Sequence, residues 1–228
     1  MKAKFGSIIV AGSGKIGGHV ASRNRSGQYL RTKTTPSNPQ TTFQSAVRSL
    51  FTFFSQAWRT LTSAQRIAWD SATANFTGTN GFGDSVTPTG KNLYLALNRN
   101  LQLVNVATIS NPPTPAGTFS FTPTTLTSSV AGSTVTVAWS SGAVPSGMAV
   151  IVDATPMLSV GVGFFKNLFK NIDYLPAADV TPTNLFNSYT ARYGALIVGT
   201  KIAMRLTPVN AVTGERGVAT TVVTIVVA

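Results

Sequence analysis

The residues whose types and spacing could support chemistry begin with a glycine-rich motif, Gly12-Ser-Gly14-Lys-Ile-Gly17. A G-x-G-x-x-G sequence after an apolar run is typical of dinucleotide binding, where the glycines form a turn and a helix N-terminus holds the pyrophosphate. That fold also needs an uninterrupted helix and an acid about 20 residues further on. Here Gly27, Pro36 and Pro39 interrupt such a helix, and the first acid is Asp70. We therefore expect a turning loop here and no cofactor.

The other candidates for catalysis are one histidine and six acids. His19 lies in a segment without acids, which argues against a Ser-His-Asp triad. The absence of Cys excludes disulfides and thiolate nucleophiles, and a single His argues against a zinc site. Asp153, Asp173 and Asp179 are close enough in sequence for a carboxylate pair or a calcium site, but turn and strand-end positions also explain them. We expect no enzyme and no metal site.

Basic residues are concentrated at the start of the chain. The first 69 residues contain ten Lys or Arg and no acid, and this segment supplies most of the net charge of +12. Charge of a single sign is poorly explained by folding, because like charges repel one another in the compact state. We therefore expect a negatively charged partner, either nucleic acid or the acidic face of another protein.

The side chains that we expect to contact this partner are basic or aromatic: Lys15, Arg23, Arg25, Tyr29, Arg31, Lys33, Arg48, Arg59 and Arg66. No base-reading helix or zinc finger accompanies them, so contacts with nucleic acid would be made to phosphates without base readout. Alternatively, the basic arm lies across the acidic surface of a neighbouring subunit. A solvated basic surface without a partner is the third interpretation.

Residues 1–35 are expected to form short β-structure. Ile8–Val10 is one candidate strand, and His19–Arg23 and Gln28–Thr34 flank a turn at Asn24–Gly27, which predicts a hairpin. The alternation along the second arm of the hairpin places Tyr29, Arg31 and Lys33 on one face.

Residues 36–109 predict a helical domain. A helical hairpin is expected from two capping-box patterns, Thr41…Gln44 and Thr62…Gln65. The first helix carries one continuous apolar stripe, formed by Phe43, Val47, Leu50, Phe51, Phe54, Trp58 and Leu61. The apolar side of the second helix carries Ala64, Ile67, Ala68, Ala72 and Phe76, and a third helix is expected over Lys91–Asn105. The stripe belongs to a core first, but any part left exposed would mark subunit packing.

Residues 110–117 contain three prolines and predict a stiff linker, and residues 118–228 predict a β-sandwich. The expected strands are Thr118–Thr122, Thr134–Ser140, Met148–Ala154, Gly161–Phe165, Ser188–Tyr193, Lys201–Pro208 and Val218–Val227. Asn210–Glu215 should join the last two strands as an exposed hairpin loop. The layout resembles a fibronectin type III domain, with Trp139 in the position of its second-strand core tryptophan. The predicted fold class is α+β: a β-hairpin arm, three helices and a fibronectin III/Ig-like β-sandwich.

An ordered series of motifs runs through residues 14–105. It comprises Gly17-Gly18-x-Val20, Ser22-Arg-Asn-Arg-Ser-Gly27-x-Tyr29-x-Arg31, Pro36-x-Asn-Pro39-Gln-Thr41, Gln44-x-x-x-Arg48, Trp58-Arg-x-Leu61-Thr-x-x-Gln65-Arg66-x-x-Trp69, Gly90-x-Asn92-Leu-Tyr94 and Asn98-x-Asn100-Leu101. This region resembles a group of proteins from tailed phages and prophages that are encoded near capsid and tail genes. The resemblance implies a structural role in the virion and brings no catalytic residues.

The sequence and the resemblance together indicate a minor structural protein of a phage particle, present as a homo-oligomer in a ring or lattice. Its basic N-terminal region would dock onto capsid, portal or tail subunits, and its partners would be other virion structural proteins. One alternative is a virion protein that contacts packaged DNA non-specifically through the basic arm. Another is a surface protein that binds host glycans through the β-sandwich. Because no segment is both long and apolar enough, we expect no membrane span.

Overall fold

The computed structural model describes residues 12–24, 27–35, 37–79, 84–117 and 119–228. The chain divides into two compact units, Met1–Ala46 and Val47–Ala228, and each unit is described by itself. Helices and antiparallel sheets are both present, so the fold class is α+β. The predicted linker at residues 110–117 lies inside the second unit.

The N-terminal unit contains a three-stranded antiparallel sheet of β1 (Gly14–Ile16), β2 (His19–Asn24) and β3 (Gly27–Thr32). The predicted hairpin is confirmed, because β2 pairs with β3 in one register along its whole length. The expected strand at Ile8–Val10 lies outside the described residues. β1 occurs instead inside the glycine motif, which the sequence had suggested to be a loop.

The glycine motif is a β-hairpin and not a nucleotide-binding turn. Ile16 pairs with His19, so Gly17 and Gly18 form a two-residue connection. Gly17 has a φ of 56°, in the left-handed region that such tight hairpin turns require and that glycine adopts without strain. Because a strand follows the glycines, the helix N-terminus needed for a pyrophosphate is missing from this motif.

The three predicted helices are present as α1 (Thr42–Thr60), α2 (Ser63–Ala72) and α3 (Gly90–Leu103). A 3₁₀ turn, η1 (Thr73–Asn75), follows α2, and a small ribbon of β4 (Gly78–Thr79) and β5 (Ser85–Val86) precedes α3. The capping box at Thr62 is complete: its hydroxyl accepts the backbone N–H of Gln65, and Oε1 of Gln65 accepts the backbone N–H of Thr62. At α1, Oγ1 of Thr41 accepts the N–H of Gln44.

Trp69 is the centre of the helical core. Its side chain is fully buried and packs edge-to-face against Tyr94, with 5.4 Å between ring centroids. Ile67 is not in this core, and its 65% exposure makes the predicted apolar side of α2 wrong at this position. Residues two apart on a helix point about 200° apart, so packing α3 against the Trp69 side of α2 directs Ile67 to solvent. Ala64 and Ala68 are likewise exposed.

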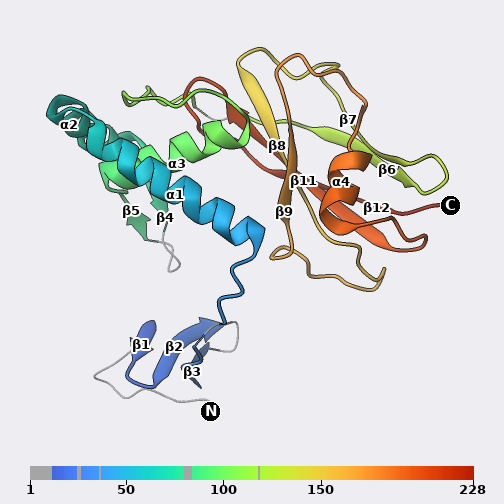
Figure 1. Ribbon diagram of the computed structural model, residues 1–228, viewed down its shortest axis with the longest axis horizontal. Coiled ribbons are helices and arrows are strands. Elements are labelled where there is room, and N and C mark those ends of the chain that lie inside the picture. Colours follow the sequence, from blue (N-terminus) through green and yellow to red (C-terminus); the bar gives the residue numbers. More distant parts are fainter. Residues whose placement is uncertain (1–11, 25–26, 36, 80–83, 118) are drawn as a thin grey trace. The chain divides into compact units, whose positions relative to one another are not determined.

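The β-rich part of the second unit consists of two antiparallel sheets (Figure 1). The first has the order β10-β7-β6, and the second has the order β12-β11-β8-β9. The strands are β6 (Pro123–Ser129), β7 (Thr134–Trp139), β8 (Met148–Ala154), β9 (Lys170–Leu175), β10 (Thr183–Asn184), β11 (Lys201–Asn210) and β12 (Thr220–Ile225), and α4 (Phe186–Tyr193) lies between β10 and β11 in the chain.

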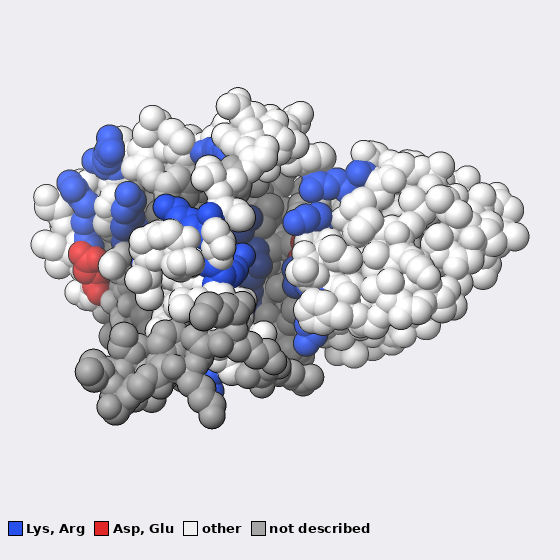
Figure 2. Space-filling model, turned by 90° about the horizontal axis from the view of Figure 1, so that it is seen from below, with Lys and Arg blue, Asp and Glu red and all other residues white. Residues whose placement is uncertain are grey.

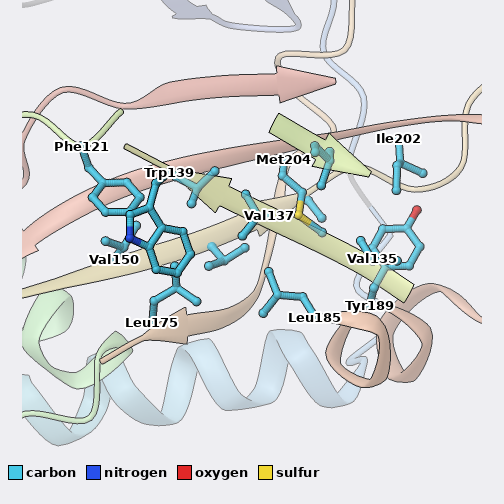
Figure 3. Packing of buried hydrophobic residues seen from close by; sticks show 14 of the residues in the cluster. Phe121, Val135, Val137, Trp139, Val150, Leu175, Leu185, Tyr189, Ile202 and Met204 are labelled. Carbon is cyan, nitrogen blue, oxygen red and sulfur yellow. The ribbon is translucent and has the colours of Figure 1, made fainter. Parts of the chain in front are cut away.

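The core of this part lies between the two sheets (Figure 3). Trp139 is buried at the end of β7, as predicted, and its ring lies against Phe121 with 5.4 Å between centroids. Val150 and Met204 belong to the same core and lie on the inner face of the second sheet. Tyr189 of α4 closes one end, and its hydroxyl donates to the carbonyl of Thr155 at 3.0 Å.

Three expected strands are wrong. Ser120 forms only an isolated bridge with Val218, and the first strand starts later, at Pro123. Gly161–Phe165 belongs to an irregular connection in which Phe165 packs on Phe169, and the next strand begins at Lys170. Ser188–Tyr193 is part of α4, because its two tyrosines are spaced by four residues and so face the core together from a helix.

The loop at Asn210–Glu215 joins β11 to β12 as predicted, but it is not an exposed loop. Thr213 and Gly214 are buried, and a Cβ on Gly214 would lie 2.5 Å from the carbonyl oxygen of Leu97. Nδ2 of Asn100 on α3 also donates to the carbonyl of Gly214 at 2.8 Å. The loop therefore packs on α3 and joins the helices to the sheets within the second unit.

Candidate functional site

The N-terminal sheet places basic and aromatic side chains together on one face. Lys15 on β1 is opposite Val20, and Val20 is opposite Arg31 on β3, so the three residues form a row across the sheet. Tyr29 is two residues from Arg31 and therefore lies on the same face. The N–H of Lys33 donates to the carbonyl of Gly18, which continues the pairing and the alternation. The predicted grouping of Tyr29, Arg31 and Lys33 is therefore confirmed, and Lys15 joins it.

Arg23 lies on the opposite face of this sheet. It pairs with Gln28 and shares its face with Ala21, which is only 2% exposed. The backbone N–H of Gly12 donates to Oε1 of Gln28 at 3.0 Å, which covers this side further. The described geometry therefore separates Arg23 from the row formed by Lys15 and Arg31. Arg25 lies outside the described residues.

The other three predicted contact residues lie on helices. Arg48 and Arg59 are on α1 and Arg66 is on α2, and all three are exposed. Eleven residues of helix correspond to about 20° of rotation, so Arg48 and Arg59 point to nearly the same side of α1. Figure 2 shows more Lys and Arg side chains than Asp and Glu side chains on the surface that it presents.

An apolar groove lies between α1 and α3 within the second unit. It has a volume of about 190 Å³ and is lined by Val47, Leu50, Phe51, Phe54, Leu95, Ala96 and Arg99. Phe54 is buried, but Val47 and Phe51 remain 53% and 61% exposed. The predicted stripe is therefore buried at Phe54 and Leu61 and uncovered in its first half, where Phe43 is also exposed. The sequence pattern revealed the α1 side of the groove but gave no signal for the α3 side.

Positive charge gathers at the end of α3 beside this groove. Nε of Arg216 donates to Oδ1 of Asn100 at 2.8 Å. Asn100 directly follows Arg99 on α3, so Arg216 is held close to this part of the helix. Desolvation lowers the pKa of the Arg216 guanidinium, and the charges of Arg99 and Arg205 lower it further, while Asp153 raises it. No sequence pattern predicted this cluster, because Arg99 and Arg216 are far apart in the chain.

The acids considered for catalysis have separate structural partners. Asp153 forms an ion pair with Arg205, with Oδ2 2.6 Å from Nη2, while the guanidinium lies over the ring of Phe169. Asp173 is opposite the core residue Val152, so it lies on the other face of the sheet from Asp153, and it accepts the hydroxyl of Ser188. Among the described residues, no group of three His, Cys, Asp or Glu side chains could hold a metal ion.

Several motif residues that might have suggested a site hold the chain in place instead. Asn98 is fully buried and binds the segment after α3: its Oδ1 accepts the N–H of Ile109 at 2.7 Å. Nε1 of Trp69 donates to the carbonyl of Ser110 at 2.8 Å, and Nε2 of Gln65 donates to Oδ1 of Asn111. These polar side chains therefore fix residues 109–111 against α2 and α3.

Within the described part of the chain, no helix combines the length and the hydropathy needed to cross a bilayer. Comparison of the chain with protein-family models, curated proteins and solved structures found no match.

Proposed function

We propose that the protein is a minor structural protein of a phage particle, which docks through its basic N-terminal region onto capsid, portal or tail subunits in a symmetric assembly. The observation that carries this proposal is the shared face of Lys15, Tyr29 and Arg31 in a stretch of sequence without acids. The resemblance of residues 14–105 to phage and prophage proteins encoded near capsid and tail genes supports the location.

The geometry of this face suits a flat, negatively charged partner. Lys15 and Arg31 are exposed on the two outer strands, β1 and β3, and the half-buried Val20 of β2 lies between them. Each cation would meet a carboxylate at the rim of an interface, where charge contributes mainly to association rate and specificity. Tyr29 supplies an aromatic contact with little loss of side-chain entropy. A partner subunit with an acidic face would therefore be held in a defined orientation.

Packaged DNA is the second candidate partner, and one observation favours it. Tyr29 lies on the same face as Lys15 and Arg31, and Lys, Arg and Tyr are among the side chains that contact the phosphate oxygens of duplex DNA without reading its sequence. If about five phosphates were neutralised, log K for duplex DNA would fall with a slope near −4.5 against log salt concentration.

Binding to duplex DNA and incorporation into particles separate the two candidates. The full chain carrying both K15E and R31E would be compared with the wild type and with R23E. The R23E variant also replaces a basic side chain by an acidic one, but on the opposite face of the sheet. The structural proposal predicts weak DNA binding, and incorporation into particles that is lost in the double variant and retained in R23E. A steep salt slope that disappears only in the double variant would favour DNA. Mass spectrometry that finds no copies in purified particles would overturn both.

We also propose that the sandwich is a fibronectin type III-like module. In that family the first, second and fifth strands form one sheet and the other four form the second sheet. The orders β10-β7-β6 and β12-β11-β8-β9 follow this division, which supports the proposal. The buried Trp139 on the second strand supports it as well. α4 departs from the family pattern. An experimental structure in which β10 pairs with a strand other than β7 would contradict the proposal.

A further inference from the structure

The groove between α1 and α3 has the character of a surface that receives side chains. Its floor is apolar, and Phe51 and Val47 stand more than half exposed at its edge. Its volume of about 190 Å³ is below the roughly 300–1,000 Å³ of small-molecule sites, and suits one or two apolar side chains. Exposed aromatic side chains at the edge of such a groove are common at protein interfaces.

The charge around the groove restricts what can occupy it. The two helices that line it carry Arg48, Arg59, Lys91 and Arg99 and no acid. Arg99 itself lines the groove, and Arg216 reaches α3 at the adjacent Asn100. Asp153, whose charge acts on Arg216, is paired with Arg205, and the carboxylate of Glu215 accepts the hydroxyl of Thr213 and the backbone N–H of Ala116. A second copy of α1 would bring more positive charge to a positive rim, so charge complementarity favours an acidic partner over self-association.

We propose that this groove binds an acidic amphipathic helix of a neighbouring virion protein, which inserts apolar side chains between Phe51 and Ala96 and places a carboxylate on Arg99. Helix-in-groove binding uses apolar anchors at i, i+3, i+4 and i+7 on the incoming helix, and an arginine at the rim fixes its register. This inference rests on the proposed function for the identity of the partner and gives that partner its chemistry.

The test uses two labelled peptides of roughly 18 residues with identical leucine anchors, one with Glu on its polar face and one with Lys. Fluorescence anisotropy measures their binding to the full purified chain. We expect the Glu peptide to bind at least about ten-fold more tightly than the Lys peptide at moderate salt. Because no particle is involved, this result is independent of whether the protein is found in virions.

Two matched pairs of variants locate the binding. F51S should weaken binding of the Glu peptide by about ten-fold or more. F53S changes a similarly exposed Phe of α1 that does not line the groove, and it should leave the binding unchanged. R99E should reverse the preference toward the Lys peptide, whereas K91E at the other end of α3 should not. Circular dichroism of each variant checks that the helices are intact.

Three results would overturn the proposal. The first is equal binding of both peptides, and the second is binding that F51S and F53S weaken equally. The third is a dimer in analytical ultracentrifugation that F51S dissociates and F53S does not, because a second copy would then be the occupant of the groove. Preferential Glu-peptide binding that R99E reverses would support it.

Discussion

Oδ1 of Asn98 accepts the backbone N–H of Ile109 at 2.7 Å, and the same side chain donates from Nδ2 to the carbonyls of Tyr94 and Ile109. One buried amide thus satisfies three backbone groups where the chain turns away from α3. Removal of a side chain that makes several hydrogen bonds in a buried site is costly, because the groups that it bonded are left without a partner.

Replacement of Asn98 by Leu should therefore lower the free energy of unfolding by about 2–4 kcal/mol, because the part-buried N–H and carbonyl of Ile109 lose their side-chain partner. Urea denaturation of the full chain measures the effect. Gln102→Ala, on the exposed side of the same helix, is the control and should change the free energy by less than about 0.5 kcal/mol. Equal effects of the two substitutions would contradict the structural role of Asn98.

Gly214 offers a test of the contact between the β11–β12 loop and α3. Gly214 and Gly199 both have a positive φ, 76° and 79°, but only Gly214 has no space for a Cβ. Gly199→Ala should cost about 1–2 kcal/mol from backbone strain alone. Gly214→Ala should cost about 1–3 kcal/mol more, because the added methyl forces the loop away from Leu97. Thermal unfolding of both variants checks the difference, and equal costs would show that the loop does not pack on α3.

The two halves of the apolar stripe on α1 should differ in their effect on stability. Phe54→Ala should lower the free energy of unfolding by about 3–5 kcal/mol, because this fully buried ring leaves a cavity. Phe51→Ala should change it by less than about 0.5 kcal/mol, since the side chain is already mostly in solvent. Chemical denaturation measures both. A large loss in Phe51→Ala would mean that the groove edge belongs to the core.

Alkaline pH should destabilise the sandwich through Tyr189. Burial raises the pKa of its hydroxyl, and Tyr193 nearby raises it further. A raised pKa in the folded state means that the folded protein holds its proton longer, so the stabilisation is complete below the ordinary value of 10.0 and is lost as pH rises above it. For each such tyrosine, the free energy of unfolding falls by up to about 1.4 kcal/mol per pH unit above the ordinary tyrosine pKa.

The measurement is the midpoint of urea unfolding at about pH 9 and about pH 11, on either side of the ordinary tyrosine pKa. Tyr189→Phe should be less stable than the wild type at the lower pH, because the hydrogen bond to Thr155 is lost. Its stability should fall less than that of the wild type between the two pH values. Identical pH dependence in wild type and variant would show that another group governs the alkaline transition.

Local signals predicted much of the fold because they act over a few residues. The capping box at Thr62 and the apolar alternation of Val135, Val137 and Trp139 both predicted the observed elements. The strand expected at Ser188–Tyr193 was wrong because Thr and Tyr favour strands on average, whereas the contacts of Tyr189 with the core determine the helix here. β9 was missed because it mixes polar and apolar residues, most of them only half-buried, and because its pairing with β8 is a long-range interaction.

For the candidate binding surfaces too, local sequence patterns predicted one part, and tertiary packing determined the rest. The alternation through Tyr29, Arg31 and Lys33 predicted one face of the hairpin. Lys15 was among the predicted contact residues, but its strand could not be foreseen inside a run of glycines. Likewise the stripe on α1 was visible, but its partner side chains on α3 depend on how two helices cross. Only tertiary packing brings Arg99 and Phe51 to the same groove.

The attachment of residues 109–111 to the helices has a mechanical consequence. Tension along the proline-containing stretch that follows would act first on the hydrogen bonds that Asn98, Trp69 and Gln65 make with residues 109–111. Because the three side chains come from two different helices, the load would be divided between α2 and α3 instead of peeling one of them away.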